Sequence, residues 1–407
     1  MPIPTDSANP LRILHLNSLL TGGGTDDQCV RLAQGLRQLG HDVWIAGPFA
    51  REFSKIARDC GLPFHAIPPP GLAKLRFIFS VAGLIKRERI QILHAHHGRD
   101  IWPAILAAKL SGIRPKIVVT RHLAKSLHSW TSRWFLLHQS DAFIAVSNFT
   151  AKILREGVYE PASRDPKRQA RPPLFGDHSK INVVYCGIDT VSFRPFDAQE
   201  LRRNWGLAPQ HFAFAVVGGY DYPRGKGQRE FLRAAAWIHE YVPDARFLII
   251  GRGNLQPDLE NDIRRYGLTA KAKLVPYYRD MPSAMNAIDC LVHPVVGTEA
   301  FGLVVCEAHA CGKPVIASAL DGLPEAFQVG GYGQLIPPDN VEELALAMHT
   351  WAETPRLDER QRLELHNKIE RRLSIAVTTR QVLEIYHSIL WPTIATTKIT
   401  PSQATTT

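Results

Sequence analysis

The chain has 407 residues, with 45% hydrophobic and 21% charged residues and a formal net charge of +10, which is typical of a soluble globular protein. This length exceeds one ordinary hydrophobic core, so we expect two domains of roughly 150–200 residues each. The opening MPIPTDSANP lacks the segments of a secretory leader, and no apolar run reaches the roughly 18 residues of a membrane span, so we expect a cytoplasmic protein. The six cysteines are scattered without a C-x-x-C pair, which indicates reduced, packed thiols.

The excess positive charge lies in the first half of the chain. Residues 1–190 contain 25 Lys and Arg against 14 Asp and Glu, whereas residues 191–407 contain 23 against 24. Residues 101–140 contain six cations and no carboxylate. Such a region attracts the phosphates of lipids, nucleotides or nucleic acids, although simple solubility is the alternative.

Short β-branched runs alternate with helical patterns along the first half. The expected strands are LRILHLN (11–17), DVWIAGP (42–48), QILHAHH (91–97), KIVVT (116–120), DAFIAVS (141–147) and INVVYC (181–186). Strands that alternate with helices predict βαβ units and a parallel sheet covered on both faces.

The second half repeats the pattern. The expected strands are FAFAVVGG, ARFLIIG, KLVPY, CLVHP, PVIAS and GQLIPP, and helices are expected at 226–241, 255–266, 281–288, 301–311 and 341–351. We therefore predict an N-terminal domain at 1–190, a C-terminal domain at 191–368, and a disordered Thr-rich tail at 392–407. A long helix near 369–391 is expected to pack back toward the first domain.

Two segments of the first domain differ from this pattern. Residues 157–180 are rich in Pro and basic residues and have no periodicity, which predicts a mobile surface loop. Residues 72–89 combine apolar positions with five cations, which would suit an anionic membrane surface. A crossover helix packed on the sheet explains the same pattern and is the interpretation that we favour.

Open parallel sheets bind ligands beyond the carboxyl ends of their strands, at glycine-rich turns and helix N-termini. Such turns occur at Gly23–Gly24, at VVGGYDYPRGKGQ (216–228) and at GRGN (251–254). Arg224 and Lys226 in the second turn suit a diphosphate, because a cation neutralises the charge of such a leaving group. Neither G-x-G-x-x-G nor a P-loop is matched. A tight turn or a solvated basic turn is the alternative in each case.

The motifs HAHH (94–97) and TRH (120–122) end strands of the first domain, on the wall that would face the second domain. His96, His97 and Arg121 are therefore predicted on the acceptor side of a cleft. A metal site at His94, His96 and His97 is disfavoured, because no carboxylate cluster is nearby and alternate strand residues point to opposite faces. No D-x-D pair occurs in the chain, so we expect neither a bound metal nor a cofactor.

The strongest signal is GTEAFGLVVCEAHACG (297–312), where Glu307 lies in an apolar run. A buried carboxylate costs several kcal/mol unless it is paired. If a helix begins near Phe301, the amides of Phe301, Gly302 and Leu303 face an anion, Glu299 lies in the loop before them, and Glu307 can accept hydrogen bonds from a ribose diol. A surface helix with one polar face is the alternative.

This segment resembles the E-x7-E signature of glycosyltransferase family four, the retaining enzymes with the GT-B fold. TGGGTDDQCVRLAQGLRQLGHDV, HAHHGRD, VSNFTAKIL, INVVYCGIDTVSFRP, the GKGQ turn, YRDMPSAMNAIDCLVHP and DGLPEAF agree in order, from about Leu11 to Trp351. The resemblance implies an α/β fold of two Rossmann-like, doubly wound parallel-sheet domains that face a cleft. It also implies a nucleotide-diphosphate sugar donor and a saccharide or lipid-linked acceptor of the cell envelope.

Carried over by motif, Glu307 resembles the ribose-binding acid and Glu299 the acid that contacts the donor sugar. His122 resembles the cleft histidine, and Gly23 and Gly24 the loop that closes over the phosphates. The remaining donor contacts implied by the family are Lys226, Gly253, Tyr278, Arg279, Ala300, Phe301, Gly302 and Leu303.

Two departures from the family are visible. Gly219 stands where the family commonly has Arg, a function that Arg224 could take over, and the insertion at 157–180 is unusually long. Two alternatives to a transferase stay open: a GT-B epimerase or phosphorylase, and a non-catalytic binder of sugar nucleotides or anionic surfaces that has lost turnover, for which Gly219 is the warning sign. Nucleic-acid binding is not expected.

Overall fold

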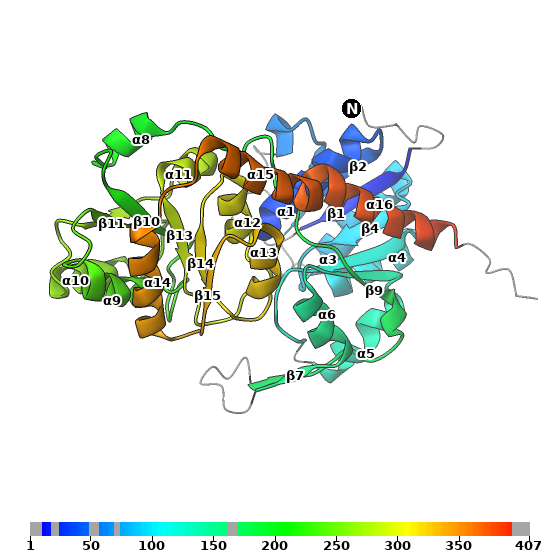
Figure 1. Ribbon diagram of the computed structural model, residues 1–407. Coiled ribbons are helices and arrows are strands. Elements are labelled where there is room, and N and C mark those ends of the chain that lie inside the picture. Colours follow the sequence, from blue (N-terminus) through cyan, green and yellow to red (C-terminus); the bar gives the residue numbers. More distant parts are fainter. Residues whose placement is uncertain are drawn as a thin grey trace, which may run out of the picture.

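The computed structural model describes residues 10–17, 24–48, 57–68, 74–127, 129–160 and 169–392. It contains two α/β domains side by side, each with a parallel sheet between helices (Figure 1). The predicted fold class is therefore confirmed. Gly23, most of the proposed tail and part of the 157–180 insertion lie outside the described residues.

The first sheet is entirely parallel, in the order β3-β2-β1-β4-β5-β6-β9. Its strands are β1 (Arg12–Leu16), β2 (Asp42–Gly47), β3 (Phe64–Ala66), β4 (Ile92–Ala95), β5 (Lys116–Arg121), β6 (Ala142–Ala145) and β9 (Ile181–Val183). The helices of this domain are α1 (Gly24–Gln38), α3 (Lys74–Glu88), α4 (Ile101–Leu110), α5 (Trp130–Gln139) and α6 (Asn148–Arg155). The sequence predicts all of these strands except β3, whose three residues are too few to show periodicity.

The second sheet is also parallel, in the order β12-β11-β10-β13-β14-β15. Its strands are β10 (Phe212–Val217), β11 (Ala245–Ile250), β12 (Ala272–Val275), β13 (Cys290–His293), β14 (Val315–Ser318) and β15 (Gly333–Ile336). Its helices are α8 (Gln199–Asn204), α9 (Gln228–Ile238), α10 (Gln256–Arg265), α11 (Met281–Ala287), α12 (Leu303–Ala310), α13 (Leu323–Gly330) and α14 (Val341–Glu353). β10 is buried along its whole length, as expected for a strand covered on both faces.

The C-terminal region differs from the single long helix that the sequence suggests. It forms α15 (Glu359–Leu373) and α16 (Ile375–Leu390), and Ser374 between them has an extended ψ of 151°. α15 packs on α12 and α13, whereas α16 packs on α1 of the first domain (Figure 1). Ile188 in the connection between the two sheets bonds to the backbone on both sides of Ser374. The chain therefore crosses between the domains twice at one place.

The described residues of the segment 157–180, which are 157–160 and 169–180, form regular structure in place of the mobile loop that the composition predicts. β7 (Val158–Tyr159) and β8 (Ala170–Arg171) pair antiparallel, and a short 3-10 helix, η1 (His178–Lys180), leads into β9. Arg171 is 1% exposed, and its guanidinium contacts Asp321 at 3.2 Å and Glu160 at 2.9 Å. The prediction was wrong for these residues because a buried ion pair, which composition does not reveal, fixes the strand.

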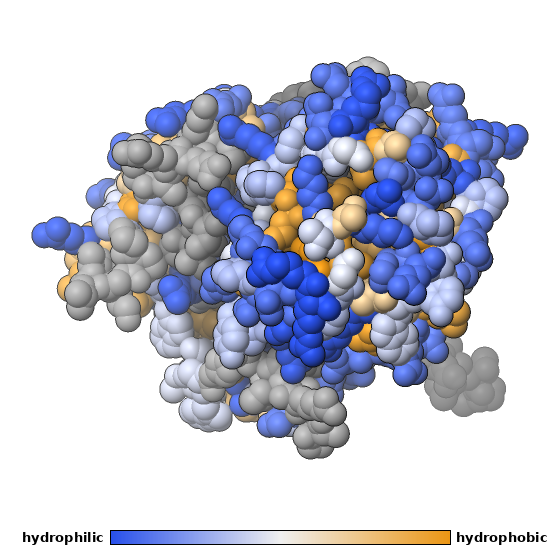
Figure 2. All heavy atoms as spheres, turned by 90° about the vertical axis from the view of Figure 1, so that its left-hand side faces the viewer, coloured by the Kyte–Doolittle hydropathy of each residue, from blue (hydrophilic) through white to orange (hydrophobic). Residues whose placement is uncertain are grey.

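The face of the second domain shown in Figure 2 is mostly hydrophilic, with hydrophobic side chains visible in a recessed area. Among the helices of the described residues, none has the length and apolarity needed to cross a bilayer.

Candidate active site

The loop between β13 and α12 carries the main acidic candidate, Glu299. Helix α12 begins at Leu303, and its N-cap residue, Gly302, has a φ of 97° and gives the helix no side-chain cap. Without a side-chain cap, the first-turn amides of α12, which begins four residues after Glu299, make this helix end suitable for an anion. The helix begins two residues later than the sequence suggests, so Phe301 precedes it and is buried.

Lys226 from the turn before α9 contacts Glu299 directly. Its Nζ lies 2.6 Å from Glu299 Oε2, and the two side chains are 35% and 17% exposed. The turn is built from glycines: Gly227 has a φ of 88°, and a Cβ there would collide with the carbonyl of Pro294. The turn thus lies against the loop that holds Glu299, and the sequence-predicted pair is brought together.

Two opposing effects set the pKa of Glu299. Burial alone would raise it, but Lys226 and His293 outweigh burial and hold the pKa of this carboxyl well below its usual range. His293 Nε2 lies 3.6 Å from Glu299 Oε2, and burial lowers the pKa of His293. Glu299 is therefore an anion that is already matched to a cation.

Glu307 has a protein partner that the sequence analysis did not find. Arg31 of α1 places its guanidinium 3.4 Å from Glu307 Oε1, and the side chains are 17% and 14% exposed. Burial raises the pKa of Glu307, Arg31 lowers it, and Asp27 raises it further. The Glu307 carboxylate therefore does not face bulk water, and it has a protein partner even when no ligand is bound.

The N-termini of α1 and α12 meet at the domain boundary. A Cβ on Gly24 would lie 2.8 Å from Leu303 Cδ1, so the first residues of the two helices are in close contact. Tyr185 of the first domain stacks on Phe301, with ring centroids 5.0 Å apart. The N-terminal ends of α1 and α12, each with the positive pole of its helix dipole, thus lie close together at the domain boundary.

Four histidines form a buried cluster on the first-domain wall. His15 bonds to His96 at 2.8 Å, and His96 bonds to His122 at 3.3 Å. His94 bonds to Thr120 at 2.7 Å and to Tyr386 of α16 at 2.6 Å. Burial lowers the pKa of His122 to about 3, with Arg121 adding to the effect, so its imidazole is neutral.

One group of potential metal ligands exists among the described residues, and it differs from the one considered from the sequence. Ligand atoms of His15, Cys29 and His96 lie within 4.8 Å of one another. Both nitrogens of His96 already bond to His15 and His122. Burial raises the pKa of the Cys29 thiol well above its usual range, which keeps the sulfur protonated. The donor set fits a hydrogen-bonded core better than a metal site.

A cavity of about 40 Å³ joins the histidine wall to the domain boundary. Arg31, His96, His122 and Tyr185 line it, as do residues of α16. Glu307 and Phe301 do not line this cavity, but they contact Arg31 and Tyr185, which do. The cavity therefore lies between the acceptor-side histidines and these two donor-side residues.

Other predicted residues lie apart from this space. The guanidinium of Arg121 donates to Lys125 O at 2.6 Å and thereby supports the loop after β5. His97 is half-buried at the start of the next turn. Tyr278 packs edge-on against Trp205, and Arg279 is exposed beside it.

The loop after β11 lies against the loop after β10. Tyr220 N donates to Arg252 O at 3.1 Å, and a Cβ on Gly253 would collide with Tyr220. A Cβ on Gly219 would meet only Arg252 O, at 3.7 Å. The glycine in place of the family arginine is therefore not required for steric reasons. Exposed Arg252 lies over the ring of Tyr277 at 5.0 Å, which supplies a cation and a flat surface that the sequence analysis missed.

Two family models match the chain in succession. The model for "Glycosyltransferase Family 4" matches residues 22–165, and the model for "Glycosyl transferases group 1" matches residues 211–354. The first match lies in the first domain and the second covers the second sheet and its helices. The chain belongs to the group 1, family 4 glycosyltransferases, and this finding favours the transferase interpretation over a non-catalytic binder or an epimerase.

Similar proteins agree with this assignment. A phosphatidyl-myo-inositol mannosyltransferase of Mycolicibacterium smegmatis is 26% identical over 383 residues, which is 90% of each chain. A D-inositol 3-phosphate glycosyltransferase of Rhodococcus erythropolis is 31% identical over 72% of this chain and 68% of its own. The crystal structure of Anabaena HepE in complex with UDP and glucose shares the fold, with a TM-score of 0.75 at 21% identity, and covers 93% of this chain and 100% of HepE.

Proposed function

We propose that the protein transfers a sugar from a nucleotide-diphosphate donor to a saccharide or lipid-linked acceptor of the cell envelope, with retention of configuration and without a metal ion. The observation that carries the proposal is the Lys226–Glu299 pair at 2.6 Å beside the uncapped N-terminus of α12. This arrangement combines a cation and free amides for a diphosphate with a carboxylate for sugar hydroxyls.

In the proposed reaction the bond from the sugar anomeric carbon to the diphosphate oxygen breaks, and a bond from that carbon to the acceptor oxygen forms on the same face. The acceptor hydroxyl gives its proton to the departing diphosphate. Lys226 and the α12 amides stabilise the charge on that diphosphate as it leaves. Neutral His122, which lines the cavity on the first-domain side, is proposed to bond with the transferred sugar.

Glu307 is proposed to accept hydrogen bonds from the ribose hydroxyls. Arg31 keeps this carboxylate compensated when no donor is bound. Backbone near Gly253 and the Tyr278–Arg279 loop are proposed to contact the base. Contact with a UDP-type donor is supported by the HepE complexes with UDP and UDP-glucose.

The acceptor proposal is supported by the names of the relatives, which act on phosphatidyl-myo-inositol or on an undecaprenol-linked saccharide. α3 has one face packed in the core and another that exposes apolar side chains. Phe77 and Val81 are buried, whereas Leu75 is 70% exposed and Phe79 is 63% exposed. On neighbouring α4, Leu110 is 59% exposed. We propose that these exposed side chains, with the basic residues around them, rest on an anionic membrane at the cytoplasmic face.

Release of nucleoside diphosphate from a panel of nucleotide sugars, with lipid-linked and saccharide acceptors, tests the activity. The proposal predicts release that persists in EDTA and a product with the anomeric configuration of the donor, read by NMR. Loss of turnover in EDTA would contradict metal independence, and an inverted product would contradict retention of configuration. Binding without release for every acceptor tried would favour a non-catalytic binder.

Vesicle flotation tests the membrane contact separately. We expect recovery with anionic vesicles that exceeds recovery with neutral ones and falls in Phe79→Asp. Trp237→Asp is a matched control, because Trp237 is 52% exposed on α9 of the second domain. Equal recovery with both kinds of vesicle would remove the membrane proposal and leave the transferase proposal standing.

A further inference from the structure

A second pocket lies at the opposite end of the second sheet from the candidate active site. It is a cavity of about 90 Å³. Asp289, Lys313 and Tyr332, which line it, come immediately before or close to the starts of β13, β14 and β15. Lys226 and Glu299 follow the carboxyl ends of β10 and β13. The two places are therefore separated by the length of the strands.

Cations outnumber carboxylates around this pocket. Asp289 accepts from Arg202 at 2.9 Å, from Arg356 at 2.7 Å and from the amide of Ala213 at 2.8 Å. Both of its oxygens are thus in use. Two further cations, Lys313 and Arg362, also line the cavity. Among the described residues, neither forms an ion pair with a carboxylate.

Lys313 is buried without a direct ion pair among the described residues, and Asp289, whose charge also acts on it, is shared with Arg202 and Arg356. Lys313 is 9% exposed, and its Nζ donates to Asn286 O at 3.0 Å. Burial, and then the neighbouring charge of Arg362, lowers the pKa of Lys313 to about 8. Burying an ammonium costs several kcal/mol unless charge and hydrogen bonds compensate for it.

Arg362 is also incompletely bonded. Its terminal nitrogen donates to Asn286 Oδ1 at 3.0 Å, while its Nε is buried without a hydrogen-bond partner. Gly312 lets α15 approach this closely, because a Cβ on Gly312 would lie 2.6 Å from Arg362 Cβ. The C-terminal carbonyls of α11 and α12 stabilise part of the positive charge of Lys313 and Arg362. A helix end carries only a partial negative charge, so it does not neutralise both cations.

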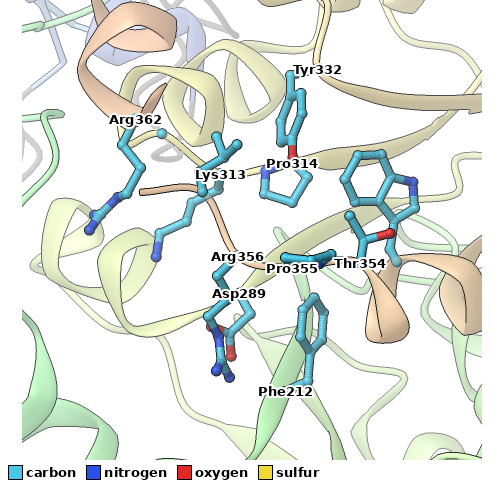
Figure 3. Close-up of a pocket in the computed structure, with 12 residues that line it drawn as sticks. Phe212, Asp289, Lys313, Pro314, Tyr332, Thr354, Pro355, Arg356 and Arg362 are labelled. Carbon is cyan, nitrogen blue, oxygen red and sulfur yellow. The ribbon is translucent and has the colours of Figure 1, made fainter. Parts of the chain in front are cut away.

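We propose that this pocket binds a phosphate group, either as inorganic phosphate or as a phosphomonoester, between Lys313 and Arg362. Figure 3 shows their charged ends on one side of the pocket, with Arg356 and Asp289 below them and the rings of Phe212 and Tyr332 on the other side. A tetrahedral oxyanion accepts several hydrogen bonds and supplies the missing negative charge. The cavity of about 90 Å³ can hold such a group, and the rings of Phe212 and Tyr332 give its lining an apolar surface.

Thermal denaturation with increasing inorganic phosphate, at constant ionic strength set by sodium chloride, tests the proposal. The wild type should show a saturable rise in the melting temperature. Arg362→Gln should weaken the apparent phosphate affinity at least tenfold, and Lys313→Met should do the same. Arg362 is only half-buried, so its variant keeps the test valid if Lys313→Met does not fold.

Because phosphate could also bind at the donor site, the titration is repeated in Lys226→Gln. Persistence of the saturable response in this variant supports the second pocket. Its loss in Lys226→Gln, with retention in Arg362→Gln, would overturn the proposal. The proposal would also be overturned if the melting temperature rose without saturation, and equally, in the wild type, Arg362→Gln, Lys313→Met and Lys226→Gln.

Glycerol phosphate in a parallel titration distinguishes the two sources of the phosphate group. Tighter binding of the ester assigns the pocket to a phosphomonoester, and tighter binding of inorganic phosphate assigns it to the free ion. A crystal soaked in tungstate should show the anomalous peak beside Lys313 and Arg362. A peak only beside Lys226 would contradict the assignment.

Discussion

Arg31 and Glu307 are 276 positions apart in the sequence, and their side chains meet at 3.4 Å across the boundary between the two domains. The contact joins α1 of the first domain to α12 of the second. Arg31 thus offsets part of the cost of keeping the half-buried Glu307 carboxylate charged without a bound ligand. Any donor that uses Glu307 has to share this carboxylate with Arg31 or displace it.

Arg31→Met should make donor binding more sensitive to acid. Burial raises the pKa of Glu307 and Arg31 opposes this, so removal of Arg31 raises that pKa further. Because hydroxyls bond to the carboxylate, affinity should fall as the pH decreases through this pKa, and the midpoint should lie at higher pH in the variant. Calorimetric titration of nucleoside diphosphates from pH 5 to 8 measures this, with exposed Arg37→Met on the same helix as the control. Identical midpoints would contradict the prediction.

Lys226→Met should lower the turnover number by about 100- to 1000-fold, the typical effect of removing one group that stabilises a developing anion. Arg224→Gln should have a smaller effect, because the described contacts place Lys226 and not Arg224 against Glu299. Arg233→Gln, exposed on α9, serves as the control and should retain wild-type rates. If Arg224→Gln were the more damaging change, Arg224 rather than Lys226 would be the main diphosphate contact.

The histidine cluster should make the fold sensitive to mild acid. Burial lowers the pKa of His15 and of His122 to about 3 and that of His94 and His96 well below the usual value. The unfolded chain therefore binds more protons below pH 6.5, so this stability is complete above pH 6.5 and is lost as the pH falls toward 3. At pH 5 the loss is roughly 2 kcal/mol each for His15 and His122. Urea unfolding between pH 7 and 5 measures it, and a flat free energy over this range would contradict it.

Arg171→Met should destabilise the protein by about 3–5 kcal/mol, because it removes the guanidinium that contacts the Asp321 carboxylate, whose side chain is 1% exposed. Arg171→Met combined with Asp321→Asn should recover part of this loss, since the buried charge is then absent. Chemical denaturation of the wild type and the two variants gives the comparison. A loss below about 1 kcal/mol, with no recovery in the double variant, would show that the pair contributes little.

Local patterns in the sequence were sufficient to predict the two sheets. The mostly apolar runs that became β1, β5, β10 and β14 are buried on both faces, so their composition indicates strands of a parallel sheet. Lys226 and Glu299 were also predictable, because both follow carboxyl ends of adjacent strands and such ends meet at one sheet edge. The break at Ser374 had a signal that was not used: Ser374 is the N-cap of α16 and bonds to Val377 N.

Contacts between distant segments could not be predicted in the same way. Arg31 reaches Glu307, and Tyr386 reaches His94, only because α1 and α16 are placed by domain packing. Helical periodicity indicates which face of α1 is polar, but not which residue of the other domain it meets. Burial of Arg171 likewise depends on Asp321, which lies 150 positions away.

Calorimetric titration of uridine, guanosine and adenosine diphosphates against the wild type and Glu307→Gln tests the central claim most directly. The proposed ribose contact predicts measurable binding of at least one nucleotide to the wild type and at least roughly tenfold weaker binding to the variant, a loss of about 1.4 kcal/mol or more. Equal affinity of both proteins for every nucleotide that binds would contradict the role of Glu307 and with it the proposed donor site.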